Sequence, residues 1–518
     1  MTLDLSRRDL LKSAAGLALP LMAPSFLASP VMAQAPIVAM PGDGHKLFTL
    51  GVASGDPWPD NVVLWTRLAP DPINGGGMGR EPVEVTWEVA TDERMQTVVR
   101  KGTATAQAEY AHSLHVEVGG LEPGRWYWYR FRTAVEDSRV GRTRTAPAPH
   151  ATVDRLRFVA TSCQDYSHGF YTGHQHMIEE DLDLVVFLGD YIYEGLPYPG
   201  GPRSHNPQDT FTIEEWRNRH ALYKTDPHLQ ACHAAFPWVV TWDDHEVDND
   251  YAGQLPGWEM DPKIFIGRRI AAYRAYYEHM PLRRQSIPQG VDMLLYRQVA
   301  FGGLIDFNVL DTRQYRDIHA CQTVRGPECA EHRSPSRSIM GMAQESWLFE
   351  QLRQNRARWN VIAQQVPMMK RALGNERGSM DKWDGYIASR DRLMDALIKY
   401  RVSNPIVLAG DIHQAVTADL LADFNDPGSR ILGSEFVMTS LASGGDGQRS
   451  PIDRQMVMAA NPHVKWGLGG RGYTRFDVTP HALRADYRSI EYISRPGAPI
   501  RTAQSFVVED RRPGLQMA

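Results

Sequence analysis

The pattern of apolar and polar residues changes character near residue 150. From about Phe48 to Thr145, short runs of alternating apolar and polar residues are separated by turn residues, as at 75–77 and 122–124. Alternation with period two is typical of half-buried strands. We therefore predict an all-β sandwich over residues 47–146, with strands at Val62–Arg67, Val83–Ala90, Ser113–Val118 and Tyr127–Arg132.

A turn followed by an aromatic-rich strand lies at 121–131, and it resembles the corner of fibronectin-type and immunoglobulin-like sandwiches. The Pro-rich stretch at 146–150 indicates a linker. Beyond it, isolated apolar runs alternate with helical patterns, which is typical of an α/β domain. We expect this second domain over residues 152–508, with helices at Phe265–His279, Gln344–Arg358 and Arg390–Tyr400.

Five of the apolar runs end in a polar residue that is able to bind a metal. They end at Cys163, Asp190, Asp243-Asp244, Asp311 and Asp411. A single Asp at a strand end is most often a turn former. Several such ends at one edge of a sheet instead predict a site there.

Two of these ends have a second ligand at a short spacing: Tyr193 follows Asp190, and His413 follows Asp411. A phenolate or thiolate ligand needs an acidic ion, so Tyr193 and Cys163 indicate ferric iron, with Asp190 able to bridge to a second ion. The carboxylates of Asp244 and Asp411 favour a hard cation such as calcium or magnesium.

The first 33 residues have the pattern of a twin-arginine (Tat) export signal. Arg7 and Arg8 precede an Ala/Leu/Gly-rich run at 13–27, and we expect cleavage after Ala33. Pro20 and Pro24 interrupt the run, which is short for a spanning helix; a membrane-anchoring helix is the alternative. We predict recognition by the Tat machinery, a periplasmic or secreted location and no stable membrane anchor after cleavage.

Net charge and cysteine content exclude two further classes of protein. The 518 residues carry a formal net charge of -5 without a polybasic tract, so nucleic acid is not expected as an obligate partner. Four cysteines are too few for a disulfide scaffold. Cys321 and Cys329 bracket a short polar loop that an oxidising periplasm would close, whereas Cys232 is expected to be a buried apolar residue.

The motifs together resemble a known family. The order Gly-Asp-x-x-Tyr, Asp-His-Glu and Gly-x-x-His resembles the calcineurin-like metallophosphoesterases. A narrower resemblance, to the PhoD-type alkaline phosphatases, covers nearly the whole chain, including the export signal. It rests on the blocks 50–57, 161–164, 189–194, 242–249, 310–316 and 408–414.

This resemblance implies the assignment of the site residues. Ferric iron would be held by Cys163, Asp190, Tyr193 and His413, and Asp190 would be shared with calcium. Asp244 and Asp411 would lie on the calcium side, with Asp243 as their neighbour. Magnesium, manganese and zinc remain the alternative divalent ions.

The resemblance also implies the residues that handle the substrate. Asn249 and Arg283 match phosphate-contacting positions, and Arg313 is a competing candidate. His245 matches a catalytic His of related two-metal phosphatases, although a His beside Asp244 could instead orient a ligand. The implied catalytic residues are Asp190, His245, Asn249 and Arg283, and the implied substrate-binding residues are Asn249, Arg283 and Arg313.

The implied catalytic fold is a four-layer α/β/β/α sandwich, and the implied reaction is attack of metal-activated hydroxide on a phosphate ester, releasing inorganic phosphate. One alternative is a phosphodiesterase with the same metals, acting on phospholipid headgroups as a phospholipase D does, or on teichoic-acid or nucleotide diesters. Another alternative, from a different class, is a periplasmic phosphate- or glycan-binding protein.

Overall fold

The computed structural model describes residues 46–354, 356–372, 377–447 and 458–518. The predicted export signal at 1–33 lies outside these residues. No helix within the described ranges is long and apolar enough to cross a bilayer.

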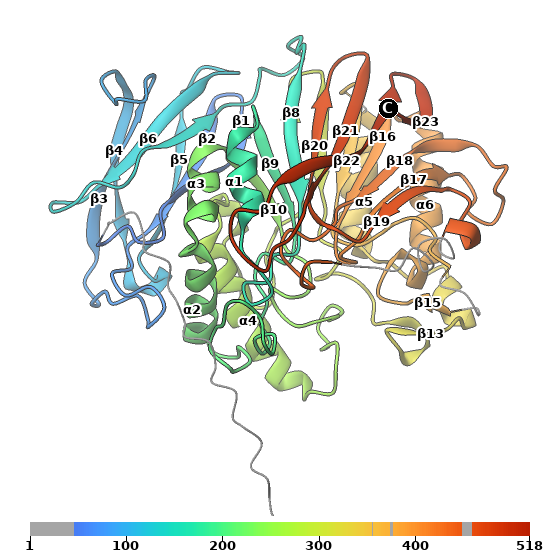
Figure 1. The fold of residues 1–518 in the computed structure, drawn as a ribbon, viewed down its shortest axis with the longest axis horizontal. Helices are drawn as coiled ribbons and strands as arrows, with labels where there is room; N and C mark the ends of the chain where they lie inside the picture. The colour runs from blue at the N-terminus through green and yellow to red at the C-terminus, as the bar shows by residue number, and fades with distance from the viewer. Residues whose placement is uncertain (1–45, 355, 373–376, 448–457) are drawn as a thin grey trace, which may run out of the picture. The chain divides into compact units, whose positions relative to one another are not determined.

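The largest sheet has ten strands that come from the beginning, middle and end of the described chain (Figure 1). Strands β8, β9, β10 and β1 are parallel, and antiparallel neighbours extend the sheet on both sides. In spatial order the strands are β23 (Arg512–Met517), β22 (Ile500–Glu509), β21 (Ala482–Ile490), β20 (Arg471–Val478), β8 (Leu156–Thr161), β9 (Leu184–Leu188), β10 (Pro237–Thr241), β1 (Val52–Trp58), β2 (Asn61–Arg67) and β5 (Ser113–Gly119).

The second large sheet has seven strands, of which β12, β14, β16 and β18 are parallel. In spatial order the strands are β11 (Arg297–Phe301), β12 (Ile305–Val309), β14 (Trp359–Ala363), β16 (Pro405–Ala409), β18 (Ile431–Val437), β17 (Ala415–Leu421) and β19 (Val464–Leu468).

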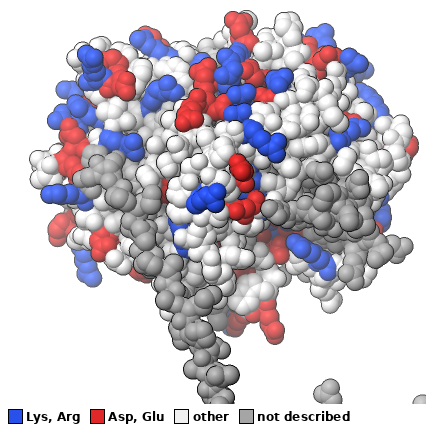
Figure 2. All heavy atoms as spheres, viewed as in Figure 1, with Lys and Arg blue, Asp and Glu red and all other residues white. Residues whose placement is uncertain are grey.

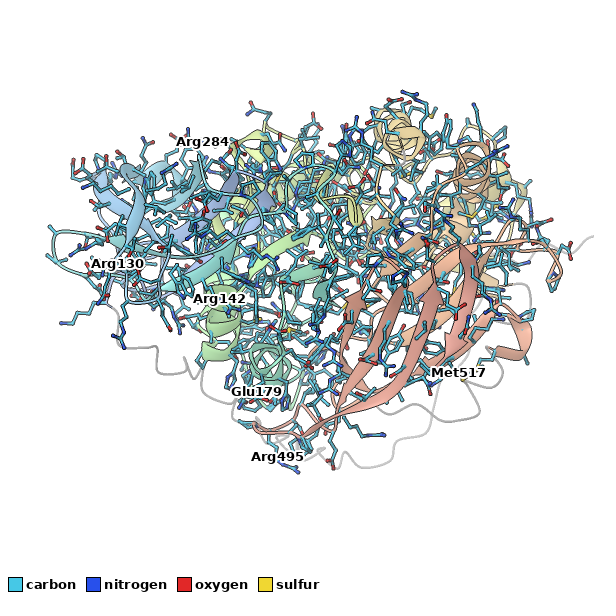
Figure 3. All side chains as sticks on the ribbon, turned by 90° about the horizontal axis from the view of Figure 1, so that it is seen from above. Arg130, Arg142, Glu179, Arg284, Arg495 and Met517 are labelled. Atoms are coloured by element: carbon cyan, nitrogen blue, oxygen red, sulfur yellow. A yellow bond between two sulfur atoms is a disulfide. The ribbon has the colours of Figure 1, made fainter. Side chains whose placement is uncertain are left out.

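Two smaller antiparallel sheets complete the strands. One has four strands, in the order β4 (Val98–Ala106), β3 (Val83–Ala90), β6 (Trp126–Arg132) and β7 (Gly141–Arg144); the other pairs β13 (Arg325–Pro327) with β15 (Arg377–Ser379). Figures 1 and 3 show the four-stranded sheet, with Arg130 on β6, at the opposite end of the described structure from the C-terminal strands and Met517.

The helices are α1 (Thr172–Glu179), α2 (Ile213–Lys224), α3 (Pro227–Ala235), α4 (Pro262–His279), α5 (Gly341–Gln354) and α6 (Ile387–Lys399). Short 3-10 turns lie at η1 (Ala108–Tyr110), η2 (Arg284–Ser286), η3 (Ala320–Gln322), η4 (Ala330–Arg333) and η5 (Trp383–Gly385). Local signals start several of these helices: Thr212 and Glu215 form a capping box on α2, and Asp226 and Asp261 cap α3 and α4 just before a proline.

Three hydrophobic clusters connect these elements. The first joins α1–α4 to β9 and β10, through residues such as Trp216, Tyr273 and Trp238. The second contains buried residues from both large sheets, including Phe158 and Phe307. The third joins the seven-stranded sheet to α5 and α6. The described residues therefore bury both faces of the central strands, which suits their continuous apolar runs.

The N-terminal region has the predicted strands, but it shares one of its layers with the central sheet. β1, β2 and β5 belong to the ten-stranded sheet because β1 pairs in parallel with β10. Gly55 permits this approach, since an added Cβ would lie 2.5 Å from the carbonyl oxygen of Pro281 and 2.8 Å from that of Trp238. The four-stranded sheet packs on this extension through a separate apolar cluster.

The face shown in Figure 2 carries acidic and basic side chains interspersed among other residues. Among the described residues visible on that face, no patch of one charge sign stands out, in keeping with the nearly balanced composition. The chemistry of the chain is concentrated instead at the carboxyl ends of the parallel strands.

Candidate metal centre and active site

The loops after four parallel strands carry the predicted metal ligands. Cys163 follows β8, Asp190 follows β9, Asp243 and Asp244 follow β10, and Asp411 follows β16. Backbone bonds join these loops: the N–H of Cys163 donates to the carbonyl oxygen of Gly189, 3.0 Å away. The two large sheets therefore deliver their strand-end side chains to one place.

Glu246 links the loop after β9 to the loop after β10. Its buried carboxylate accepts hydrogen bonds from the backbone N–H of Tyr191 (2.5 Å) and of Asp243 (2.8 Å). Burial, followed by the charge of Asp190, raises the pKa of Glu246 to about 8. This residue holds the backbone after β9 against the backbone after β10.

Several ligand candidates have an uncommon backbone conformation. Cys163, Asp190, Asp411 and His413 have φ values of 59°, 54°, 68° and 54°, which lie in the left-handed region. Non-glycine residues adopt this region rarely, and such residues cluster at functional sites. The tight turns direct these side chains toward one another at the strand ends.

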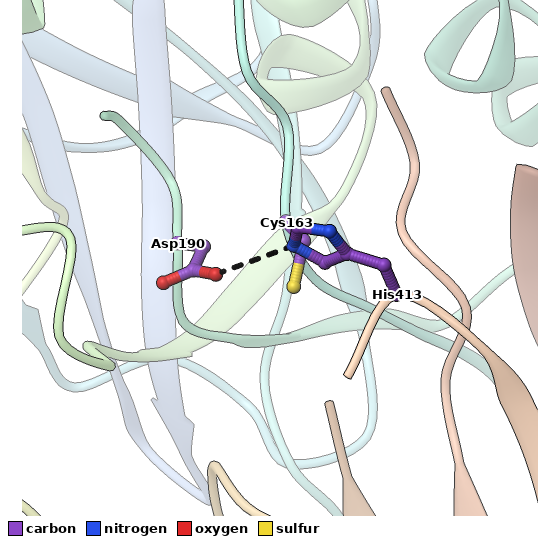
Figure 4. A group of neighbouring side chains, drawn as sticks. All are labelled: Cys163, Asp190 and His413. Carbon is purple, nitrogen blue, oxygen red and sulfur yellow. Dashed lines mark ion pairs between the residues drawn. The ribbon is translucent and has the colours of Figure 1, made fainter. Parts of the chain in front are cut away.

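Cys163, Asp190 and His413 form the first group of candidate ligands (Figure 4). One ligand atom from each lies within 4.8 Å of the others. Tyr193 joins this group, because its hydroxyl donates to Asp190 Oδ2 at 3.0 Å and lies 3.0 Å from His413 Nε2. The structure thus brings together all the residues that the sequence assigned to iron.

The electrostatics of this group suit a bound cation. Burial and then the charge of Asp190 raise the pKa of both Cys163 and Tyr193 well above the usual range. The buried Oδ1 of Asp190 has no hydrogen-bond partner among the described residues. A cation would satisfy this oxygen and lower both pKa values, so the donor set fits a metal ion of high charge.

The second group of candidate ligands is made of Asp243, Asp244 and Asp411. Arg313 bonds to all three carboxylates, with N–O distances of 2.5 Å, 3.3 Å and 3.2 Å respectively. Asp243 Oδ2 is buried without a hydrogen-bond partner among the described residues. Hard oxygen donors of this kind fit calcium or magnesium.

Asp381, Lys382 and Asp250 extend the second group, although the sequence motifs did not place Asp381 or Lys382 there. Asp381 lies 2.7 Å from Arg313, and Lys382 forms ion pairs with Asp381 (2.6 Å) and Asp411. Asp244, Asp250 and Asp381 also bring ligand atoms within 4.8 Å. Burial, with the charges of Asp381 and Asp244, raises the pKa of Asp250 to about 7.

His245 lies beside both groups and has a buried carboxylate partner, Glu194. His245 Nδ1 donates to Glu194 Oε2 at 2.7 Å, and the ring packs on Tyr193 with 4.1 Å between centroids. Burial lowers the pKa of His245, but Glu194, Asp190 and Asp244 outweigh it, so the pKa lies well above its usual range. One ring nitrogen of His245 also lies within 4.8 Å of a carboxylate oxygen of Asp190 and of Asp244.

These residues border a cavity of about 630 Å³. Its wall includes Asn249, whose backbone N–H donates to Glu194 Oε1 at 2.9 Å and whose side chain is exposed. The remaining described lining residues are Asp190, Asp244, His245, Asp250, Arg325, Arg371, Ser379, Lys382, Asp411, Ile412, His413 and Gln414. Asn249 therefore lies where a phosphate group could meet it.

The structure does not bring Arg283 to this cavity. Its guanidinium donates to Asn61 Oδ1 (2.7 Å) and to the carbonyl oxygen of Asp56 (2.5 Å), and it lies over the ring of Trp58. Arg283 thus joins the N-terminal strands to the segment after α4. This placement contradicts the expectation that Arg283 contacts phosphate, because both of its Nη atoms bond within this interface and the residue does not line the cavity.

The competing arginine, Arg313, is at the site but beneath its surface. Its side chain is 0% exposed, and its donors face carboxylates, so it balances their charge rather than lining the cavity. Asp311, another strand-end residue, forms a turn: its carboxylate accepts from the backbone N–H of Arg313 and of Gln314.

Comparisons with known proteins agree with this geometry. The sequence model of the PhoD-like phosphatases matches residues 158–487, and that of their N-terminal domain matches residues 34–147. Alkaline phosphatase D of Bacillus subtilis (strain 168) is 50% identical over 486 residues, with 92% of this chain and 83% of the relative covered. A solved structure described as that of PhoD has a TM-score of 0.90 at 49% identity, covering 92% of this chain and 93% of that one.

The fold, the acidic and His-containing site and these similarities define a hydrolase of phosphoric ester bonds. The chain belongs to the PhoD-like phosphatase family. Its mixed sheets, helices and N-terminal domain are those expected from the sequence.

Proposed function

We propose that this protein is an exported alkaline phosphatase that hydrolyses phosphate esters at a mixed centre of Fe³⁺ and Ca²⁺. The observation that carries this proposal is the convergence of Cys163, Asp190, Tyr193 and His413 next to the carboxylates of Asp243, Asp244 and Asp411. Thiolate and phenolate donors favour the ferric ion, and the carboxylates favour calcium.

The contacts support a division of the candidate ligands between the two ions. Cys163, Asp190, Tyr193 and His413 would hold iron, and Asp190 would be shared with calcium held by Asp244 and Asp411. When bound, the ions supply Lewis acidity that draws charge from phosphoryl oxygens and acidifies water. Arg313 and Lys382 limit the repulsion among the carboxylates, so that the site stays assembled.

Asn249 and His245 are the residues proposed to act on the substrate. Asn249, with its exposed amide at the cavity wall, would donate to an equatorial phosphoryl oxygen. His245, kept protonated by Glu194, would hold a proton close to the leaving group. Arg283 has no part in this proposal.

We infer the export and domain organisation from the sequence. The proposed units are a Tat signal at 1–33, an N-terminal β-sandwich domain at 47–146 and a catalytic domain at 152–508; the two family matches support the last two. The three hydrophobic clusters support an α/β/β/α layering of the catalytic domain. After cleavage the mature enzyme would be periplasmic or secreted.

The test is metal analysis combined with turnover. Protein purified without added metals should contain iron and calcium and should release phosphate from p-nitrophenyl phosphate at alkaline pH. Active protein that contains neither ion would contradict the metal assignment. Metal-loaded protein that binds phosphate without turnover would contradict the enzymatic role.

A further inference from the structure

The cavity wall has an acidic part and a basic part. The acidic part holds the candidate metal ligands, among them Asp190, which is 2% exposed. The basic part consists of Arg325, Arg371 and Lys382. Lys382 forms ion pairs with Asp381 and Asp411. Arg325 is exposed, so it lies nearer to solvent than the candidate metal ligands.

Arg325 differs from the two arginines that follow its loop in the chain. Arg333 forms an ion pair with Glu328 at 3.3 Å, and Arg337 forms one with Glu331 at 3.2 Å. Among the described residues, no carboxylate forms an ion pair with Arg325, although it borders the cavity. Its five donors therefore remain able to bind an anion that enters the cavity.

The backbone that carries Arg325 is held at the cavity. The disulfide between Cys321 and Cys329 closes the loop, as the sequence predicted. Arg325 pairs with Ser379 in the β13–β15 sheet, and the N–H of Met380 donates to the carbonyl oxygen of Val324 at 2.9 Å. Ser379 lines the same cavity, and Asp381 and Lys382 follow it two and three residues later in the chain. Backbone hydrogen bonds thus hold the loop of Arg325 against the segment that carries Asp381 and Lys382.

We propose that Arg325, assisted by Arg371, forms a subsite for a second anionic group on the substrate. The preferred esters would then carry a phosphate on the leaving group in addition to the phosphate that is cleaved. A guanidinium binds phosphate through two parallel hydrogen bonds, and a loop that is already closed loses little conformational entropy on binding. This inference rests on the proposed phosphoesterase function, because it places the scissile phosphate at the metal carboxylates.

The test compares two substrates that differ by one phosphate, propyl phosphate and propane-1,3-diyl bisphosphate. Wild-type enzyme with its metals should have the higher kcat/KM for the bisphosphate. Arg325→Gln should lower kcat/KM for the bisphosphate by about fivefold to tenfold and change that for propyl phosphate by less than about twofold. Arg325→Lys, which keeps the charge but not the paired donors, should retain part of the preference.

Arg333→Gln is the matched control, because it removes an exposed arginine of the neighbouring turn η4 that is absent from the cavity wall. This substitution should leave kcat/KM unchanged for both substrates. The wild-type preference should also weaken when salt is raised to about 0.5 M, because an exposed charge contact is screened.

Two results with Arg325→Gln would overturn the subsite. One is an Arg325→Gln variant that keeps the wild-type preference for the bisphosphate, and the other is an equal loss on both substrates. Failure of the proposed function is distinguishable, because wild-type enzyme would then hydrolyse neither substrate. A bisphosphate preference that Arg333→Gln removes as strongly as Arg325→Gln would assign the effect to general surface charge and would also overturn the proposal.

Discussion

The pairing of Glu194 with His245 gives the sharpest prediction. In Glu194→Gln the volume of the side chain is kept, but the negative charge 2.7 Å from His245 Nδ1 is lost. Glu194 also accepts from the backbone N–H of Asn249, so the change reaches both residues proposed to meet the substrate. The iron ligands are not altered by this substitution.

The expected magnitude follows from the bond that is weakened. A hydrogen bond to a charged group contributes about 1.5–3 kcal/mol, and loss of a partner that orients a functional His costs about 10-fold to 100-fold in activity. Glu194 raises the pKa of His245, so its neutralisation must lower that pKa. The alkaline limb of the pH–rate profile, where a protonated His245 would lose its proton, should move to lower pH by about 1–2 units.

The assay is kcat/KM for p-nitrophenyl phosphate measured from about pH 6 to about pH 11, with iron and calcium content determined for each preparation. Glu88→Gln is the matched control, since it breaks a partly buried ion pair of 2.8 Å with Arg130 on the four-stranded sheet. It should leave the pH profile unchanged. Wild-type kcat/KM with an unmoved alkaline limb in Glu194→Gln would refute the reasoning, and activity loss in proportion to lost metal would assign Glu194 to metal retention instead.

Three further predictions concern the ligands and the core. Asp190→Asn should lower turnover by about a thousandfold or more without unfolding the chain, because a shared ligand positions both ions; near-normal turnover would contradict the bridging role. A calcium-selective chelator should abolish turnover reversibly while iron remains bound, which metal analysis before and after dialysis would check. Burial lowers the pKa of His174 to about 3, whereas its pKa in the unfolded chain is near 6.5. Below about pH 6.5 the unfolded chain therefore takes up a proton that the folded chain does not, so the free energy of unfolding is highest above about pH 6.5 and falls as the pH falls toward 3. His174→Phe should therefore reduce the loss of unfolding free energy between pH 7 and pH 5 by about 2 kcal/mol, measured by urea titration at each pH; an unchanged difference would exclude this role.

Local patterns predicted the parts of the molecule that depend on local chemistry. The strands β3 and β6 were expected from alternation, and helix α4 from its period and its end at His279. The convergence of Cys163 and Asp190 was expected because buried strands deliver their last residues to one edge of a sheet. These features need no knowledge of distant partners.

The rest depended on contacts between segments that lie far apart in the sequence. The pairing of β1 with β10 merges the N-terminal region with the central sheet, and no periodicity encodes it. The position of Arg283 was not predictable for the same reason. Its motif predicted a contact with phosphate, whereas its guanidinium bonds to Asn61 and Asp56, which lie far away in the sequence. Asp381 and Lys382 enter the site from a loop that has no strand-end pattern.

The visible absorption spectrum of the native protein tests the central claim most directly. Ferric iron bound by Tyr193 and Cys163 should give a charge-transfer band in purified, active enzyme. The hydroxyl of Tyr193 lies 3.0 Å from Asp190 Oδ2 and 3.0 Å from His413 Nε2, which are two of the proposed iron ligands. Tyr193→Phe should shift or weaken that band while the circular dichroism of the fold is retained. A colourless and fully active enzyme that contains no iron would contradict the account.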